Sequence, residues 1–139
     1  VEAAQLGQLR LIDVPSTYGN WTWQNYSLSA PANLTQATAD PDGDGVANLA
    51  EYAWKLNPAA RSSPRTELTT PAAGTFTFRF KRPSNLPGVT LIAECSTDLK
   101  TWQPASAAVT ASDADFDTLE STASTATPCF WRVRFDSVP

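Results

Sequence analysis

The stretch Thr75–Lys81 (TFTFRFK) decides the fold class of this chain. Its three phenylalanines fall at alternate positions and share one face, while the polar residues share the other. This alternation predicts a β-strand with one buried and one solvated face. Similar alternation predicts strands at 89–95 and 131–135, and weaker patterns predict strands at 107–111 and 118–123. Since no strand–helix–strand rhythm occurs, we expect an antiparallel β-sandwich over residues 75–139.

The N-terminal part of the chain follows other patterns. A strand is predicted at 6–14, and aromatic residues at helical spacing predict a short helix within 17–29. An acidic loop with its following helix occupies 40–56, and these elements together form an expected annex at 1–58. Residues 59–74 carry prolines among Ser, Thr and Ala, which predicts an extended connector. We therefore expect one compact, mainly β unit: an antiparallel sandwich with an N-terminal helical annex that carries one calcium loop.

Residues 40–51 (DPDGDGVANLAE) match the twelve-residue EF-hand loop. Carboxylates stand at positions 1, 3, 5 and 12, position 7 offers a backbone carbonyl, and position 9 offers a direct or water-mediated ligand. The predicted metal ligands are Asp40, Asp42, Asp44, Val46, Asn48 and Glu51. Gly45 stands at position 6, where the chain turns sharply. Calcium takes about six to eight oxygen ligands, and without a cation the crowded carboxylates would repel. Calcium is therefore the expected cofactor.

The helix after the loop is predicted from apolar residues at i, i+3, i+4 and i+7, and we expect it to stop at Asn57-Pro58. Sensor EF-hands pair two loops and expose a Met-rich groove. This chain has one such loop and no methionine, so a structural ion is expected. Asp113, Asp115 and Asp117 repeat the first three ligand positions without the glycine or the closing glutamate, which favours a solvated hairpin turn.

The composition argues against several classes of protein. The chain has no histidine, which removes the Ser-His-Asp triad and imidazole acid–base chemistry. Carboxylates such as Glu94 and Asp98 have no convergent partners in the sequence, so we do not expect an enzyme. The net charge of −4 comes from the calcium loop, because the remaining charges balance. No nucleic-acid partner is therefore expected. No apolar run is long enough to predict a membrane span.

The segment Asp40–Pro58 resembles the DPDGDGxxNLxEYA segment near the C-termini of large exported proteins of Verrucomicrobia and Planctomycetes. In those proteins a tryptophan-containing helix precedes this segment and a β module follows it. The motifs of the β module are matched by Phe76–Phe80 (FTFRF), Glu94–Trp102 (ECSTDLKTW) and Phe130–Phe135 (FWRVRF). The loop is also similar to the calcium loops of dockerins, which need two loops, and of thrombospondin type 3 repeats.

The resemblance covers roughly residues 17–136, and it implies a non-catalytic accessory or surface module of a larger exported bacterial protein. The module would be secreted or held at the cell surface, and upstream domains of its parent protein would be its partners. Relatives have a glycine where this chain has Lys55. A carbohydrate-binding module of a secreted glycoside-active enzyme is the alternative, with a polysaccharide as its partner.

The cysteines and three tryptophans bear on these expectations. In a secreted protein, Cys95 and Cys129 are expected to form a disulfide, which would contribute about 4 kcal/mol on the chain-entropy model; two buried thiols are the alternative. For the carbohydrate alternative, the possible sugar-stacking residues are Trp21, Trp23 and Trp54. The competing interpretation is that Trp21 and Trp54 pack the helices onto the sandwich.

Overall fold

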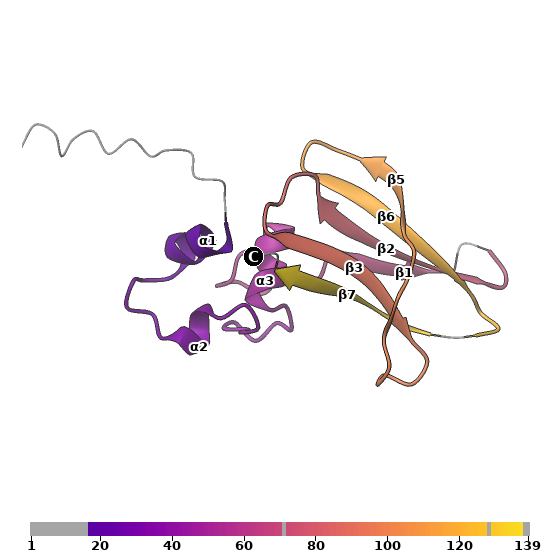
Figure 1. Ribbon diagram of the computed structural model, residues 1–139, viewed down its shortest axis with the longest axis horizontal. Helices are drawn as coiled ribbons and strands as arrows, with labels where there is room; N and C mark the ends of the chain where they lie inside the picture. Colours follow the sequence, from indigo (N-terminus) through magenta and orange to yellow (C-terminus); the bar gives the residue numbers. More distant parts are fainter. Residues whose placement is uncertain (1–16, 71, 128, 138–139) are drawn as a thin grey trace, which may run out of the picture.

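The computed structural model describes residues 17–70, 72–127 and 129–137, and the strand predicted at 6–14 lies outside them. The described chain is mainly β, with two antiparallel sheets and three short helices that precede them in the sequence (Figure 1). No helix within the described ranges is long and apolar enough to cross a membrane. The predicted fold class is therefore confirmed at the level of a mainly β, sandwich-like architecture.

The two sheets contain seven strands in the described residues. The first sheet has the spatial order β1 (Thr66–Thr69), β2 (Thr75–Pro83), β6 (Phe116–Ser124) and β5 (Ala108–Ser112). The second has the order β4 (Gln103–Pro104), β3 (Val89–Ser96) and β7 (Phe130–Ser137). The five predicted strands correspond to β2, β3, β5, β6 and β7. β1 and β4 were not predicted, and β1 lies inside the segment expected to be a connector.

The apolar residues of the two sheets form one core between them. Phe78 and Phe80 from the first sheet are buried with Leu91 and Ala93 from the second. Trp131 stacks on Phe78 with ring centroids 5.3 Å apart. On the face predicted to be buried, Phe78 and Phe80 are buried and Phe76 is half-buried, while Thr77 of the face predicted to be solvated is buried as well. On the same face as Thr77, Arg79 forms ion pairs with residues of both flanking strands, Glu67 and Glu120.

The motif residues of β3 and β7 form hydrogen bonds across the outer face of the second sheet. Glu94 is buried and accepts hydrogen bonds from Arg132 and Arg134 of β7. The guanidinium of Arg132 also lies 4.1 Å from the ring centroid of Trp102. In the turn after β3, Asp98 accepts from the amides of Thr101 and Lys100, which lowers the pKa of Asp98 to about 2. These residues therefore have structural partners.

The helices are α1 (Tyr18–Asn25), α2 (Ala32–Thr35) and α3 (Asn48–Trp54). α1 confirms the helix predicted within 17–29, and it begins after Thr17, whose hydroxyl accepts from the amide of Asn20 at 3.3 Å. α3 lies between α1 and the strands (Figure 1). It is held against the strands by Trp54, whose Nε1 donates to the Lys81 carbonyl at 2.8 Å and whose ring meets Phe135 edge-on.

The predicted end of α3 was wrong. The helix ends at Trp54, before Asn57-Pro58, because Lys55 takes the left-handed conformation with φ 54°. The amide of Lys55 then bonds back to the carbonyls of Glu51 and Tyr52. A left-handed residue after the last helical turn is a common helix end and is most often glycine. Lys55 therefore ends the helix in a conformation that glycine adopts more readily.

Candidate metal centre

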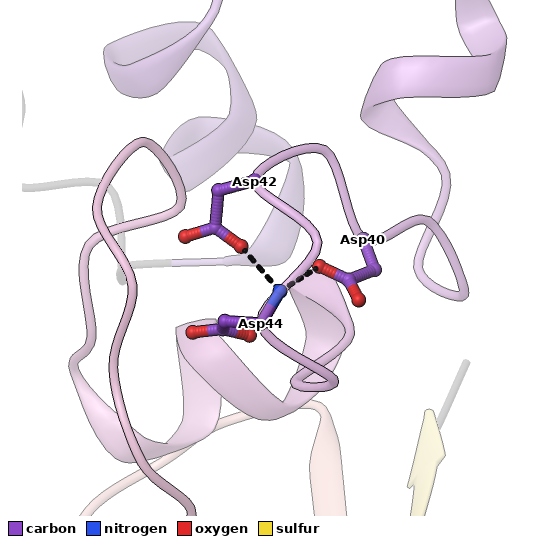
Figure 2. Close-up of side chains that lie close together, drawn as sticks. All are labelled: Asp40, Asp42 and Asp44. Carbon is purple, nitrogen blue, oxygen red and sulfur yellow. Dashed lines mark hydrogen bonds between the residues drawn. The ribbon is translucent and has the colours of Figure 1, made fainter.

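The loop before α3 is folded around its own carboxylates. Asp40 accepts through Oδ1 from the amides of Gly43 and Asp44, at 2.9 and 3.2 Å, and through Oδ2 from Gly45 at 2.9 Å. Asp42 accepts through Oδ1 from the amide of Asp44, at 3.2 Å. Figure 2 shows the side chains of Asp40 and Asp42 on either side of that amide. The tight curvature of the loop is therefore stabilised by hydrogen bonds between residues of the loop itself.

Two glycines permit this curvature. Gly43 has φ 69° and Gly45 has φ 91°, a region that residues with a Cβ atom adopt at a cost. A Cβ atom at either position would meet no heavy atom within 4 Å, so backbone conformation rather than space requires the glycine. The sharp turn predicted at Gly45 is confirmed.

The three aspartates lie close enough together to share a cation. One carboxylate oxygen from each of Asp40, Asp42 and Asp44 lies within 4.8 Å of the others. Calcium ligands at about 2.3–2.6 Å from one ion can be separated by at most about twice that distance. The spacing of the cluster therefore suits a common ion.

A second observation points to a cation at the same place. Glu51 is fully buried, and neither of its carboxylate oxygens has a hydrogen-bond partner; the same holds for the buried Oδ2 of Asp42. Burial, and then the charges of Asp42, Asp44 and Asp40, raises the pKa of Glu51 to about 7. Buried carboxylate oxygens are normally paired because their desolvation is costly. The residues present therefore fit a cation, although Glu51 lies outside the three-aspartate cluster.

The two remaining predicted ligands have other roles as well. Val46 is buried with Ala50 and Trp54, and its amide donates to Oδ1 of Asp44 at 2.7 Å. Asn48 is fully buried and accepts a hydrogen bond from the hydroxyl of Tyr26 at 2.6 Å. Its side-chain amide donates to the carbonyls of Leu34 and Gln36. Asn48 therefore ties the segments of α1 and α2 to α3, and ligation by Val46 or Asn48 stays a prediction.

Sequence reasoning missed a contact from outside the loop. Both the amide and the hydroxyl of Ser62 donate to Oδ2 of Asp44, at 2.6 and 2.9 Å. Arg61 donates to the carbonyl of Gly43 at 3.3 Å. The amides of Ser62 and, next, Val46 lower the pKa of Asp44. No local pattern marks Ser62, because it lies 18 residues from Asp44 in the sequence.

The repeated acidic positions 113–117 do not form a second cluster. Oδ1 of Asp113 accepts from the amides of Asp115 and Phe116, which closes the turn between β5 and β6. Asp117 pairs with Arg82. Within the described ranges, Asp40, Asp42 and Asp44 form the only group of three acidic or thiol ligands. The hairpin-turn interpretation of 113–117 is therefore confirmed.

The three tryptophans considered for sugar stacking lie in different environments. Trp54 is buried against the sheets, and the half-buried Trp21 packs against Tyr18, Tyr26 and Tyr52. Trp23 is 72% exposed and lines a hollow of about 140 Å³. Trp23 is therefore the one of the three that a sugar ring could stack upon.

The two cysteines are half-buried free thiols. Cys95 of β3 lies opposite Trp131 of β7, and Cys129 precedes Trp131 by two residues, so the alternation of strands brings it toward the same face. Burial, and then the neighbouring Cys95, raises the pKa of the Cys129 thiol. The pair is therefore adjacent but not bonded in this structure.

No family model, curated protein or solved structure matches this chain. The fold and the site together define a mainly β domain with two antiparallel sheets and an acidic cluster on the loop before α3. The function has to be argued from that loop and from the contacts around it.

Proposed function

We propose that this chain is a calcium-stabilised, non-catalytic accessory or surface module of a larger exported bacterial protein, secreted or held at the cell surface. The observation that supports it best is the set of three buried carboxylate oxygens without donors, on Glu51 and Asp42, beside the aspartate cluster. The resemblance of Asp40–Pro58 to a segment of exported proteins supplies the context, and upstream domains of the parent protein are the proposed partners.

The chemistry of the donors favours calcium. All the proposed ligands are oxygens, from Asp40, Asp42, Asp44 and Glu51, completed by the Val46 carbonyl and by Asn48 directly or through water. Hard cations prefer oxygen ligands, and calcium tolerates the irregular geometry that a flexible loop supplies, whereas magnesium demands a near-octahedral shell. An ion at this place would offset the repulsion among the carboxylates and the desolvation of Glu51.

Calcium would act here through stability. An ion that binds only the folded chain stabilises it by its binding free energy at the prevailing concentration. Glu51 lies on α3, whose Trp54 packs on Phe135 and bonds to Lys81. An ion bound by both Glu51 and the loop would therefore attach the loop to helix α3, which contacts both sheets.

Other contacts support a role without catalysis. The carboxylates outside the loop that were considered for chemistry, Glu94 and Asp98, are engaged by arginines of β7 and by turn amides. Such contacts are structural.

We also propose that Cys95 and Cys129 form a disulfide after export to an oxidising compartment, where thiols of secreted domains commonly pair.

Thermal unfolding with excess calcium and with a chelator tests the proposal. We expect a calcium-dependent rise in melting temperature of roughly 10 °C or more, since a ligand at about a thousand times its Kd contributes about 4 kcal/mol. Glu51→Gln should abolish most of the rise. Asp98→Asn, in the turn after β3, serves as the matched control and should preserve it. Equal melting temperatures of the native chain with calcium and with chelator would refute the proposal.

The carbohydrate-binding alternative retains one specific observation, the exposure of Trp23 beside its hollow. Aromatic rings on a module surface can stack on the apolar faces of sugars, and calcium would then only shape the module. The alternative thus depends on Trp23 rather than on the set of three tryptophans.

A further inference from the structure

We propose that Ser62 is a positioning residue for Asp44, and that through it calcium controls the docking of segment 61–65 and strand β1 on the first sheet. This inference rests on the proposed calcium site and names its structural consequence. Residues 61–65 lead directly into β1, which begins at Thr66. The expected connector would then be the element that transmits metal binding to the sheet.

The first part of the argument lies at the loop. In the part of the chain that the structure describes, the hydrogen bonds of Asp40 and Asp42 come from amides of the loop itself. Asp44 differs, because its Oδ2 receives both donors of Ser62. Outer partners of this kind orient a ligand carboxylate before the metal arrives. The contact of Arg61 with the Gly43 carbonyl adds a second attachment beside it.

The second part lies at the other end of the segment. Nε of Arg65 donates to the carbonyl of Trp54 at 2.8 Å, and the guanidinium lies 4.8 Å from the ring centroid of Phe116. The carbonyl of Arg65 accepts from the amide of Lys81 at 3.0 Å. Trp54 in turn donates to the carbonyl of Lys81. Helix α3, segment 61–65 and strand β2 are therefore joined by a closed set of hydrogen bonds.

Strand β1 is the element most sensitive to this attachment. It has four residues, lies at the edge of the first sheet, pairs only with β2, and exposes most of its side chains. Short, exposed edge elements open locally at low free-energy cost. Calcium that fixes Asp44 would also fix Ser62, and so would reduce the opening of β1. Because binding linkage is reciprocal, loosening the segment must weaken calcium binding by the same factor.

Calcium titration calorimetry on four variants tests the positioning role. Ser62→Ala should raise the Kd for calcium about tenfold, at the low end of what outer-partner substitutions cost. Ser62→Thr keeps a hydroxyl donor and should restore the Kd to within about twofold. Ser63→Ala, at the exposed neighbouring serine, should leave the Kd unchanged. Arg65→Gln, outside the loop, should also weaken calcium binding if the coupling runs through the segment.

Hydrogen exchange measures the docking directly. Calcium should slow amide exchange in peptides covering residues 61–69 of the native chain, and Ser62→Ala, which loses the hydroxyl donor to Asp44 but keeps the amide donor, should reduce that protection. The coupling is refuted if the native chain and Ser62→Ala bind calcium equally well, or if calcium does not change amide exchange at residues 61–69. Either result leaves the calcium site itself in place. Failure of the native chain to bind calcium would overturn the proposed function and this inference together.

Discussion

The buried carboxylate of Glu51 and the half-buried carboxylate of Asp42 both carry buried oxygens without hydrogen-bond partners, and the charge of Asp42 is the foremost of the nearby charges that raise the pKa of Glu51. Repulsive pairs of this kind persist in folded proteins when something offsets them. Because of this relationship, the sign of the stability change caused by substituting Glu51 should depend on whether a cation is bound.

Glu51→Gln should therefore have opposite effects in two solutions. With a chelator at about pH 8, the variant should unfold at a higher temperature than the native chain, because it removes a buried, unpaired charge. The gain is bounded by the shift in pKa, at about 1.4 kcal/mol per pKa unit. With excess calcium, the variant should unfold at a lower temperature, because it loses a charged ligand.

Paired melting curves by circular dichroism measure both effects. The control is again Asp98→Asn, whose effect should have the same sign in the two solutions because Asp98 accepts from the amides of Lys100 and Thr101 in the turn after β3. Destabilisation by Glu51→Gln in both solutions would contradict the unpaired state of the carboxylate in the metal-free protein.

Calcium binding should weaken as the pH falls. Without metal, the folded-state pKa of Glu51 is about 7, above its ordinary value of 4.5. A raised pKa means that this group stabilises the metal-free fold below about pH 4.5 and that the contribution is lost as the pH rises through about 7. Calcium needs the ionised form, so it competes with the proton in this window.

Calorimetry in two buffers of different ionisation enthalpy measures that competition. Near pH 6, binding should release up to about one proton, and the released fraction should approach zero above about pH 8. A calcium affinity that stays constant between those pH values would mean that Glu51 does not titrate in the metal-free protein.

Gly45→Ala should impair the loop through its backbone. Because φ is 91° and no atom crowds the missing Cβ, the expected cost is conformational, about 1–2 kcal/mol. Calcium affinity should fall correspondingly, measured by titration. Gly19→Ala in α1 is the matched control, since its backbone is not left-handed and its Cβ would meet only Thr17 Oγ1 at 3.9 Å. That variant should be neutral or slightly stabilised. Equal losses in both would contradict a conformational role of Gly45.

Oxidation of the thiol pair should stabilise the chain independently of calcium. Oxidised glutathione would accept the two electrons, as the Cys95 and Cys129 sulfurs lose their protons and bond. Mass spectrometry under non-reducing conditions should show the linkage, and reduction should cost up to about 4 kcal/mol. β7 begins at the end of its sheet away from α3 (Figure 1), so the effects of calcium and disulfide should add. Thiols that both remain free after oxidation would refute the pairing.

Binding to polysaccharides tests the carbohydrate alternative. If Trp23 stacks on sugar, the native chain should be retained on an immobilised polysaccharide, and Trp23→Ala should abolish retention, since stacking is lost with the ring. Val109→Ala, which trims another exposed apolar residue, on strand β5, should not affect it. If the native chain binds none of the polysaccharides tested, the purely structural module is favoured.

Local sequence predicted the features that depend on short spacings. The loop 40–51 concentrates its acidic side chains within twelve residues, and the structure places three of them together. The period of two in Thr75–Lys81 placed three phenylalanines on one face, and Phe78 and Phe80 of that face are buried, because strand side chains alternate between faces. In each case, the residues that act together are neighbours in the sequence.

Tertiary structure decided the features that join distant residues. Ser62 reaches Asp44 across 18 positions and Tyr26 reaches Asn48 across 22, and no periodicity marks either pair. The pairing of β1 with β2 and the burial of Trp54 likewise follow from how α3 and the sheets pack. The conformations of turns and helices depend on residues that are close together in the sequence, so the sequence alone determined the acidic loop. The partners of its carboxylates depend on which segments the packed core brings beside it, so only the tertiary structure decided them.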